Sequence, residues 1–253
     1  MLKKQLEQRK HQQNKMVYVH NIDPVLVHLG PVVIRYYGLV YVIGFCIAYA
    51  LLNYFIKKKQ IALTEDERDT FLLYAALGVL IGSRVFYFLF YNFANILNNP
   101  LQLFKIWEGG MSFHGGLIGV FVGACIFCKQ HKKDFYELAD IVAIPATIGL
   151  GLGRIANFIN GELYGRPTSL PWAVDFSDGI PRHPSQLYES AKNFMIFGML
   201  WILKDKNLKK GTLFWTFITV YGAFRFMIEF VRQPDPQLGF VLFNVFTMGQ
   251  ILT

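Results

Sequence analysis

The feature that most constrains this chain is an uncharged stretch of 21 residues from Tyr36 to Ile56, with Arg35 before it and Lys57 after it. A helix rises about 1.5 Å per residue, so this stretch is long enough to cross the ~30 Å hydrocarbon core of a bilayer. It begins too late, is too long and lacks the small-residue cleavage site of a secretory signal peptide. We therefore expect a membrane-spanning helix here.

Five further apolar stretches follow this first one, which runs over about 34–56 when its flanks are included. They lie at about 70–92, 111–129, 138–159, 186–203 and 211–231. Each carries ionisable side chains, and because a lipid-facing charge is costly, we expect these to face a protein or water-filled interior. A shorter uncharged stretch at 240–253 has the composition of an incomplete seventh helix.

The composition of the chain supports a membrane protein. Hydrophobic residues make up 53% and charged residues only 17%, against about a quarter charged residues in typical soluble domains. A soluble bundle of long buried helices is the alternative, but too little polar surface would remain to cover such a core. We therefore predict an all-α fold, a polytopic membrane helix bundle with six spans and a partial seventh.

The distribution of basic residues predicts the orientation of this bundle. Lysine and arginine gather in the predicted loops 57–69, 129–135 and 204–210, whereas the loops 93–110 and 160–183 hold fewer. By the positive-inside rule the lysine-rich loops are cytoplasmic. We therefore expect the N-terminus and the 160–183 loop to lie outside. Since the net charge of +8 comes mostly from loops between apolar stretches, we predict no nucleic-acid partner.

The N-terminal residues and the cysteines add little to this picture. Residues 1–15 are basic, rich in glutamine and nearly free of apolar groups, so we expect a disordered tail before an integral membrane domain at 16–253. The three cysteines imply no disulfide framework. Cys125 and Cys128 lack the second Cys or His pair that would complete a zinc site, and we predict no metal site.

One candidate for proton-transfer chemistry is His114. It stands at the head of a helix face formed by Gly115, Gly119 and Gly123, and such a small-residue face lets another helix or a lipid chain approach closely. An imidazole suits proton transfer near neutral pH. A histidine that is simply hydrogen-bonded at the membrane interface is the alternative, and spacing alone favours it.

Two intramembrane arginines indicate an anion site. Arg154 shares a helix face with Asn157 and is flanked by Gly149 and Gly153, which leave room for a phosphate beside the planar guanidinium. An arginine that reaches out to lipid headgroups is the alternative, but it does not explain the glycines or Asn157.

The second arginine, Arg225, lies four residues from both Tyr221 and Glu229, so the three share one stripe of a helix. Arg225 and Glu229 alone would be an ordinary structural ion pair. Two arginines inside one bundle repel each other, however, unless an anion lies between them or each has its own carboxylate. A phospholipid headgroup is the anion that a membrane offers.

Other motifs are structural or absent. We interpret Arg84 as structural and expect it to pair with Asp140 or Glu189. The chain has no His-Glu-x-x-His, Gly-x-Ser-x-Gly, P-loop or dinucleotide motif, which excludes the common metalloproteases, serine hydrolases and nucleotide-binding enzymes that carry these signatures.

Taken together, these residues resemble the phosphatidylglycerol–prolipoprotein diacylglyceryl transferase family. The resemblance runs in order from about Met16 to the C-terminus, and the stretch from Arg154 to Arg166 is its most specific part. The stretches that carry it are Ile34–Leu39, Gly109–Gly119, Gly153–Arg154, Asn157–Arg166, Arg182–Glu189, Tyr221–Phe226 with Glu229, Arg232–Asp235 and Met248–Gln250.

The resemblance implies an integral enzyme of the bacterial inner membrane with its N-terminus outside. The enzyme moves the diacylglyceryl group of phosphatidylglycerol onto the thiol of a lipobox cysteine in a preprolipoprotein, and glycerol 1-phosphate leaves as a thioether forms. It also implies that Arg154 and Arg225 hold the headgroup and the leaving phosphate. The further site residues that it implies are Tyr37, His114, Asn157, Glu162, Tyr221 and Glu229.

Three departures from the family pattern stand out. The last helix is incomplete, the 160–183 outer loop is short, and residues 1–15 have no family counterpart. The stability or outer rim of the bundle, and a periplasmic cap over the protein substrate, are the features that these departures put in question.

The expected chemistry is displacement at a saturated carbon, with the substrate's cysteine as the nucleophile. A free thiol has a pKa of about 8.5, so a base is needed. We expect His114 to take the proton, with a tyrosinate or a site carboxylate as alternatives, and the arginines to stabilise the leaving phosphate without a metal or cofactor. The rival readings are a transporter or channel for an anionic solute and a lipid-binding scaffold without catalysis.

Overall fold

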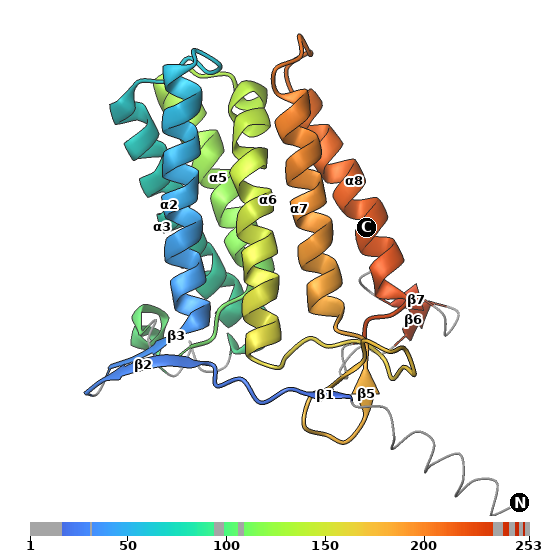
Figure 1. The fold of residues 1–253 in the computed structure, drawn as a ribbon. Coiled ribbons are helices and arrows are strands. Elements are labelled where there is room, and N and C mark those ends of the chain that lie inside the picture. Colours follow the sequence, from blue (N-terminus) through green and yellow to red (C-terminus); the bar gives the residue numbers. More distant parts are fainter. Residues whose placement is uncertain are drawn as a thin grey trace, which may run out of the picture. The chain divides into compact units, whose positions relative to one another are not determined.

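The structure is a computed structural model that describes residues 17–30, 32–93, 99–105, 109–234, 240–242, 246–247 and 250. Six long helices dominate it (Figure 1), and they cover the six apolar stretches predicted above. They are α2 (Tyr36–Lys57), α3 (Glu65–Tyr91), α5 (Phe113–His131), α6 (Phe135–Ile159), α7 (Ser185–Leu203) and α8 (Thr212–Glu229). A short 3₁₀ helix, η1 (Pro100–Phe104), lies between α3 and α5.

The start of α3 differs most from the sequence expectation, because the helix begins at Glu65 and not near residue 70. Thr64 caps this helix through its side chain, which accepts a hydrogen bond from the Glu67 backbone N–H at 3.2 Å. The Glu67 carboxylate accepts one from the Thr64 backbone N–H at 2.8 Å in return. This capping box satisfies two helix-end donors and extends α3 by a polar first turn.

Four of these helices are long and apolar enough to cross a membrane, namely α2, α3, α5 and α6. The chain is therefore a mostly helical protein of membrane character. Helices α7 and α8 form where two further spans were expected, but they do not meet the same measure of apolar length among the described residues.

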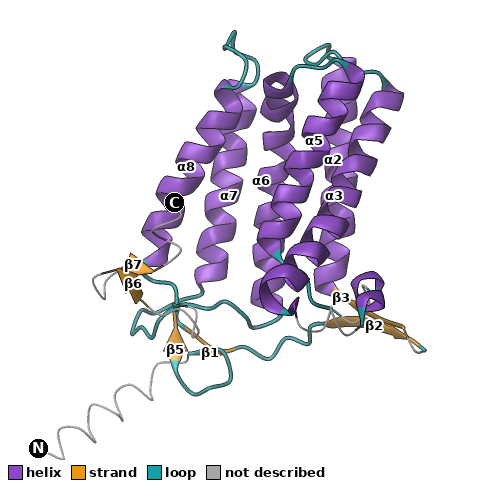
Figure 2. Cartoon of the chain, turned by 180° about the vertical axis from the view of Figure 1, so that it is seen from behind, coloured by secondary structure: helices purple, strands orange, loops and turns teal. Residues whose placement is uncertain are grey.

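The expectation of an all-α fold is wrong in detail, because three small sheets accompany the helices (Figure 2). Strands β2 (Val25–Leu29) and β3 (Val32–Arg35) form an antiparallel hairpin. Gly30 lies beside its turn with φ of +60°, a conformation that glycine adopts without strain. The valine-rich sequence on both sides of this glycine favours extended structure, so the signal was present in the sequence.

The second sheet joins the N-terminal segment to the loop between α6 and α7. Its order is β1 (Tyr18–Val19), β4 (Val174–Asp175) and β5 (Pro181–Arg182), with β1 parallel to β4 and β4 antiparallel to β5.

The partial seventh helix expected at 240–253 is wrong for the described residues of 240–247, which form strands, whereas Gln250 is helical. Phe240–Leu242 forms β6 and Phe246–Thr247 forms β7, and the two strands pair antiparallel. Aromatic and β-branched residues favour this pairing in a stretch too short to span a bilayer. The remainder of 240–253 apart from Gln250, like the expected tail at 1–15 and Met16, lies outside the described residues.

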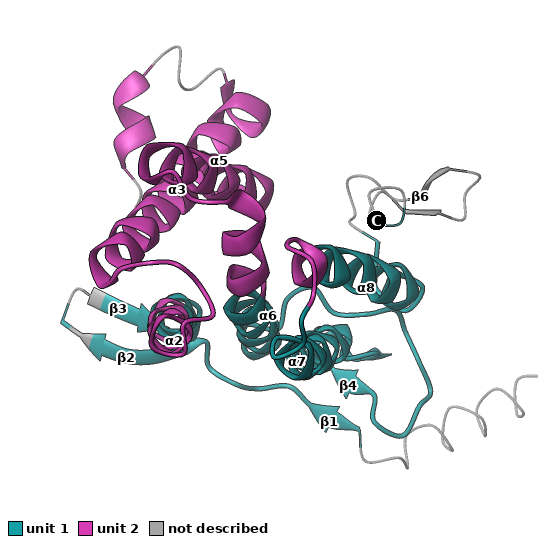
Figure 3. Cartoon of the chain, turned by 90° about the horizontal axis from the view of Figure 1, so that it is seen from above, with its two compact units in different colours: residues 1–44, 144–207, 215–253 teal, residues 45–143, 208–214 magenta. Residues whose placement is uncertain are grey.

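The chain divides into two compact units, coloured separately in Figure 3. Unit 1 comprises residues 1–44, 144–207 and 215–253, and unit 2 comprises residues 45–143 and 208–214. Each unit is described by itself below.

In unit 2, α3 and α5 pack together through glycines. A Cβ added to Gly119 would collide with the backbone of Gly78, and one added to Gly115 would meet the carbonyl oxygen of Gly82. A Cβ on Gly123 would lie 2.9 Å from the Tyr74 carbonyl oxygen. The glycine face predicted on α5 is therefore occupied by another helix.

Arg84 of α3 fastens the connection between α3 and α5 within unit 2. Its guanidinium donates to the backbone carbonyl oxygens of residues in and after η1. The acceptors are Gln102 at 2.6 Å, Leu103 at 3.2 Å, Lys105 at 2.7 Å, Gly110 at 3.1 Å, and Gly109. Arg84 thus has the structural role expected for it.

The carboxylate partners expected for Arg84 are wrong. Asp140 instead accepts hydrogen bonds from the backbone N–H groups of Gly211 at 2.7 Å and Phe214 at 2.8 Å, which lie at the start of α8. It therefore supplies the anionic cap that a helix N-terminus favours. Glu189 pairs with other arginines, described below.

In unit 1, the loop between α6 and α7 folds back on the end of α8. Gly165 forms an isolated bridge with Arg232, and a Cβ on this glycine would lie 2.6 Å from both His183 Cβ and the Val231 carbonyl oxygen. The Arg166 guanidinium donates to the Arg232 carbonyl oxygen at 3.0 Å. Only glycine allows such a close approach at position 165.

Candidate functional site

Unit 1 brings the two predicted intramembrane arginines to one buried carboxylate. Nε of Arg154, from α6, lies 3.0 Å from Oε2 of Glu189 on α7. Nη1 of Arg225, from α8, lies 3.7 Å from Oε1 of the same carboxylate. The side chain of Glu189 is only 2% exposed. The arginines are therefore neighbours, and they share one carboxylate where the sequence suggested one carboxylate each or an anion between them.

Arg225 has a second carboxylate on its own helix. It forms a hydrogen-bonded ion pair with Glu229, four residues later, as the sequence spacing predicted. Nη1 of Arg232 lies 3.6 Å from the same Glu229 carboxylate. Glu229 is 2% exposed, so it anchors two arginines in a nearly dry environment, where a paired charge is held firmly in place.

A buried lysine completes the group. Nζ of Lys192 lies 3.7 Å from Oε2 of Glu189 on the same helix, and 3.7 Å from the centre of the Tyr221 ring on α8. We call Arg154, Glu189, Lys192, Arg225 and Glu229 the arginine–carboxylate cluster. It holds three cations and two carboxylates, so it carries a surplus of positive charge that favours a bound anion.

Asn157 links the cluster to the outer loop. Nη1 of Arg154 donates to its side-chain oxygen at 3.5 Å, and its own amide nitrogen donates to a carboxylate oxygen of Glu162 at 2.7 Å. Asn157 is 6% exposed, whereas Glu162 is exposed. The structure thus assembles Arg154, Asn157 and Glu162 as one chain of hydrogen bonds, with its outer end open to a ligand.

The surface of α6 next to Arg154 is open. A Cβ added to Gly149 or Gly153 would meet no atom within 4 Å among the described residues. This contrasts with the α5 glycines of unit 2, which are filled by α3. The side chain of Arg154 is 20% exposed, so it is partly reachable beside this open helix surface.

Two predicted site residues are not joined to the cluster by any contact in the described part of the chain. Tyr37, in α2 of unit 1, is half-buried and packs against Tyr41 with ring centres 5.5 Å apart. His114 belongs to unit 2, where it is exposed in the first turn of α5 and contacts the ring of Phe113 at 5.7 Å. Their roles therefore remain predictions.

Glu189 and Lys192 are the residues that sequence reasoning missed. The sequence predicts Glu189 as a candidate partner of Arg84 and gives Lys192 no role in the site. A signal was available, because these two charged residues lie three positions apart in α7 and hence on one face. Two arginines in other helices required a carboxylate of this kind.

No metal site is evident within the described residues, where no group of three or more His, Cys, Asp or Glu side chains could hold a metal ion. The three cysteines are free thiols; Cys46 and Cys125 are exposed and Cys128 is buried.

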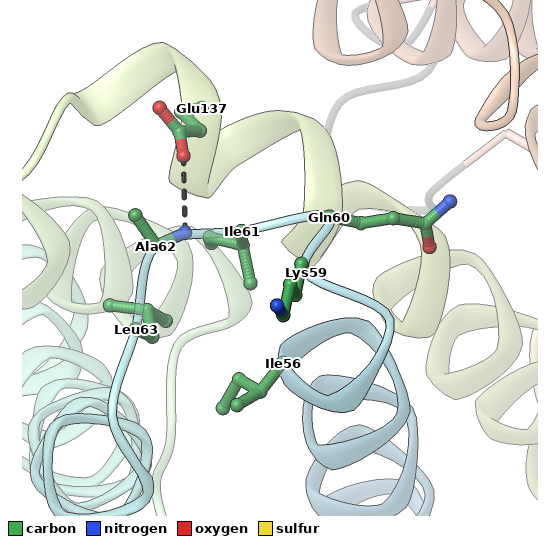
Figure 4. A pocket seen from close by; sticks show the side chains of 7 residues that line it. All are labelled: Ile56, Lys59, Gln60, Ile61, Ala62, Leu63 and Glu137. Atoms are coloured by element: carbon green, nitrogen blue, oxygen red, sulfur yellow. Dashed lines mark hydrogen bonds between the residues drawn. The ribbon is translucent and has the colours of Figure 1, made fainter.

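A pocket in unit 2 contains none of the predicted site residues. It lies at the connection between α2 and α3 (Figure 4), and the Ala62 backbone N–H donates to the Glu137 carboxylate beside it at 3.3 Å. Its lining residues are Ile56, Lys59, Gln60, Ile61, Ala62, Leu63 and Glu137. The lining mixes one lysine and one glutamate with aliphatic groups, and we assign it no chemistry.

Comparison with known proteins gives a consistent result. Residues 24–253 match the family model described as prolipoprotein diacylglyceryl transferase. A protein of Geobacter sulfurreducens is 48% identical over 236 residues, which cover 92% of this chain and 90% of that protein. Proteins of Coxiella burnetii and Legionella pneumophila are each 45% identical over 241 residues, covering 94% of this chain and 92% and 94% of theirs. All three are named phosphatidylglycerol–prolipoprotein diacylglyceryl transferase.

Proposed function

The chain belongs to the prolipoprotein diacylglyceryl transferase family, and from this we propose that it transfers the diacylglyceryl group of phosphatidylglycerol to the lipobox cysteine of a preprolipoprotein. A thioether forms and glycerol 1-phosphate leaves. The observation that carries the proposal is the meeting of Arg154 and Arg225 at the buried carboxylate of Glu189. Such a pair of guanidiniums suits a phosphate, which each can bind through two N–H groups.

The reaction is a displacement at a saturated carbon. The sulfur of the substrate cysteine forms a bond to the glyceryl carbon, and the bond from that carbon to the phosphate oxygen breaks. The electron pair of the broken bond stays on the phosphate, which changes from a diester with one negative charge to a monoester that can carry two. Arg154 and Arg225 stabilise this developing charge in surroundings from which water is largely excluded.

The thiol must lose its proton for the sulfur to attack. We assign this proton to His114, directly or through a water molecule, because an imidazole is suited to accept it near neutral pH. A tyrosinate or a carboxylate of the site is the alternative base. His114 is exposed at the first turn of α5, which leaves its ring nitrogens accessible.

The remaining predicted residues orient the lipid. Glu229 fixes the guanidinium of Arg225, with which it is paired. Asn157, which donates to Glu162, holds the glycerol of the headgroup together with Tyr37 and Tyr221. These assignments require no metal or cofactor, because the arginines supply the positive charge that a metal would otherwise bring.

The membrane arrangement follows from the charge distribution. We assign six spans, with α7 and α8 added to the four strongly apolar helices, and an N-terminus on the outer side of a bacterial inner membrane. The lysine-rich connections after α2, α5 and α7 support this orientation under the positive-inside rule. The lipobox segment then approaches from the outer side.

The proposal is tested by incubating the purified chain with phosphatidylglycerol vesicles and a lipobox peptide. We expect the peptide to gain the mass of one diacylglyceryl group, and a peptide with serine in place of the cysteine to gain none. An anion transporter would instead give solute flux into vesicles and no covalent product. Lipid binding without product would identify a scaffold.

A further inference from the structure

Lys192 is a buried cation that has no role in the mechanism proposed above. It lies in α7, one helical turn after Glu189, and its side chain is 0% exposed. Its Nζ has no hydrogen-bond partner in the part of the chain that the structure describes. Burying a charge in this way costs free energy that an apolar side chain of similar length would avoid. A specific electrostatic role accounts for this cost.

Two contacts define the surroundings of this ammonium group. It stands over the face of the Tyr221 ring, 3.7 Å from the ring centre, which is a favourable position for a cation. It also lies 3.7 Å from Oε2 of Glu189, the oxygen that Nε of Arg154 approaches to 3.0 Å. Lys192 therefore acts on the same carboxylate oxygen as Arg154, and on the tyrosine of the neighbouring helix.

The consequence is that three cations share one carboxylate. Arg154, Lys192 and Arg225 all lie within 3.7 Å of Glu189, whose single negative charge can neutralise only one of them. Glu229 offsets a second positive charge through Arg225. Arg232 also approaches Glu229, at 3.6 Å, so the arginines around the two carboxylates already outnumber them, and Lys192 adds one further positive charge. In a nearly dry environment such a surplus acts over several ångströms.

We propose that Lys192 is a positioning residue of the transfer reaction, which holds Glu189 and Tyr221 and adds to the positive surplus that the two arginines offer the departing phosphate. This proposal rests on the proposed function. Because its side chain is fully buried, Lys192 does not touch the lipid, and it acts through Glu189, Tyr221 and its electrostatic field.

The proposed role matches the charge change of the reaction. The carbon–oxygen bond to phosphate breaks as the carbon–sulfur bond forms, and the thiol proton goes to the base assigned above. The phosphate therefore gains one negative charge between the bound diester and the departing monoester. A cluster with a smaller positive surplus would favour the more charged product less, whereas the added charge of Lys192 stabilises the charge that develops in the transition state.

The test compares three variants of the full-length chain in phosphatidylglycerol vesicles. Lys192→Met removes the charge and keeps the length, and Lys192→Arg keeps the charge. Lys204→Met is the matched control, because Lys204 is also nearly buried at 3% exposure, stands 4.4 Å from the centre of the Trp201 ring and pairs with Asp205 at 2.8 Å. Three quantities are measured: the transfer rate, the inhibition constant of glycerol 1-phosphate, and the rise in melting temperature that glycerol 1-phosphate causes.

We expect Lys192→Met to lower kcat and to weaken inhibition by glycerol 1-phosphate, each by about tenfold or more. Lys192→Arg should restore most of both, and Lys204→Met should match the parent. Equal inhibition of the parent and Lys192→Met would overturn the proposal, and so would a Lys192→Arg variant that folds but is as impaired as Lys192→Met. If Lys192→Met does not fold, Lys192→Gln, which also removes the charge, takes its place in both comparisons.

Failure of the proposed function is distinguishable from failure of this inference. A parent chain that makes no lipidated peptide contradicts the transferase assignment itself. The thermal shift then still tests Lys192, because glycerol 1-phosphate is the probe and no turnover is needed. An equal shift for the parent and for Lys192→Met would reject the positioning role.

Discussion

At the scale of single residues, the carboxylate of Glu189 organises the site. A lone carboxylate as buried as this one would be strongly unfavourable, and so would two buried guanidiniums without a counter-charge. The carboxylate and the guanidiniums compensate each other's charge, because Arg154 and Arg225 approach opposite oxygens of Glu189. The two arginines are therefore held together by Glu189 without a bound anion, and the phosphate that we propose would join an arrangement that is already formed.

Replacement of Arg225 by lysine tests whether the planar guanidinium matters. Lysine keeps the charge but has no fork for bidentate contact, so we expect the transfer rate to fall by about tenfold or more. Peptide lipidation measured by mass gives the rate. Arg68→Lys is the control, because Arg68 is also buried and is paired with Asp69 at 2.8 Å in unit 2. Unchanged turnover in Arg225→Lys would contradict bidentate phosphate binding.

Replacement of His114 by glutamine tests the assigned base. Glutamine retains hydrogen bonding but cannot accept the thiol proton, so the transfer rate should fall by about a hundredfold, within the usual range for general-base catalysis. Binding of phosphatidylglycerol, followed by co-purified lipid, should change little. If rate and binding fall together by the same factor, His114 has a structural role, and the base is one of the alternatives.

The 160–183 loop should become less stable as the pH falls. Burial lowers the pKa of His183 below its ordinary value of 6.5, so the folded loop binds this proton less readily than the unfolded chain. Its stabilising contribution is complete above pH 6.5 and is lost as the pH falls from there toward the lowered folded pKa. Limited proteolysis of the 160–183 loop across this range measures the effect. His183→Phe should remove this pH dependence, and persistence of the dependence in that variant would assign it to another group.

Asp178 also makes the loop less stable as the pH falls, but in a more acidic range. Burial raises the pKa of Asp178, but the hydrogen bonds and the charge of Arg182 outweigh this effect and hold the pKa below 3.8. Its contribution to loop stability is therefore present above that value and is lost only below it. The two groups act in separate pH windows.

At the scale of helices, the contact between α3 and α5 depends on glycines, because their lack of a side chain lets the two backbones approach closely. Gly119→Ala places a methyl group against the backbone of Gly78, and backbone cannot yield as a flexible side chain can. We expect a loss of about 2 kcal/mol of stability, as overpacking typically costs, measured as a lower melting temperature in detergent. Gly198→Ala in α7 is the control, because its Cβ meets no atom within 4 Å among the described residues. Equal melting temperatures for the two variants would contradict the close packing.

The helices could be predicted from the sequence because each is a long apolar stretch, and length and composition alone identify such elements. The three small sheets were not predicted, because strands of two to five residues leave no clear periodic signal. Only the β2–β3 hairpin had a signal in its composition, the valines on both sides of Gly30. The early start of α3 was visible in principle, because Thr64 and Glu67 have the spacing of a capping box. Hydropathy does not show this start, because the first turn of α3 is acidic.

The site was predicted in part, for a physical reason. Periodicity shows which residues share a helix face, and it placed Arg225 with Glu229 and Arg154 with Asn157 correctly. Periodicity does not show which helices are neighbours, so the position of Glu189 between the arginines could not be obtained from it. The same limit explains why Arg84 received the wrong partners.

At the scale of the whole molecule, the reaction needs a nucleophile from the protein substrate and none from the enzyme. Alanine at Cys46, Cys125 and Cys128 together should therefore leave lipidation of the peptide within about twofold of the parent, since the buried Cys128 is a small apolar side chain in an apolar helix. An inactive but folded triple variant would show that a thiol of this chain takes part in the transfer.

The proposed mechanism requires that two guanidiniums hold one phosphate. An experimental structure with phosphatidylglycerol bound in a lipid nanodisc measures this directly. We predict that the headgroup phosphate lies within hydrogen-bond distance, about 3 Å, of both Arg154 and Arg225. A phosphate bound elsewhere, or either arginine turned toward the acyl chains, would contradict it.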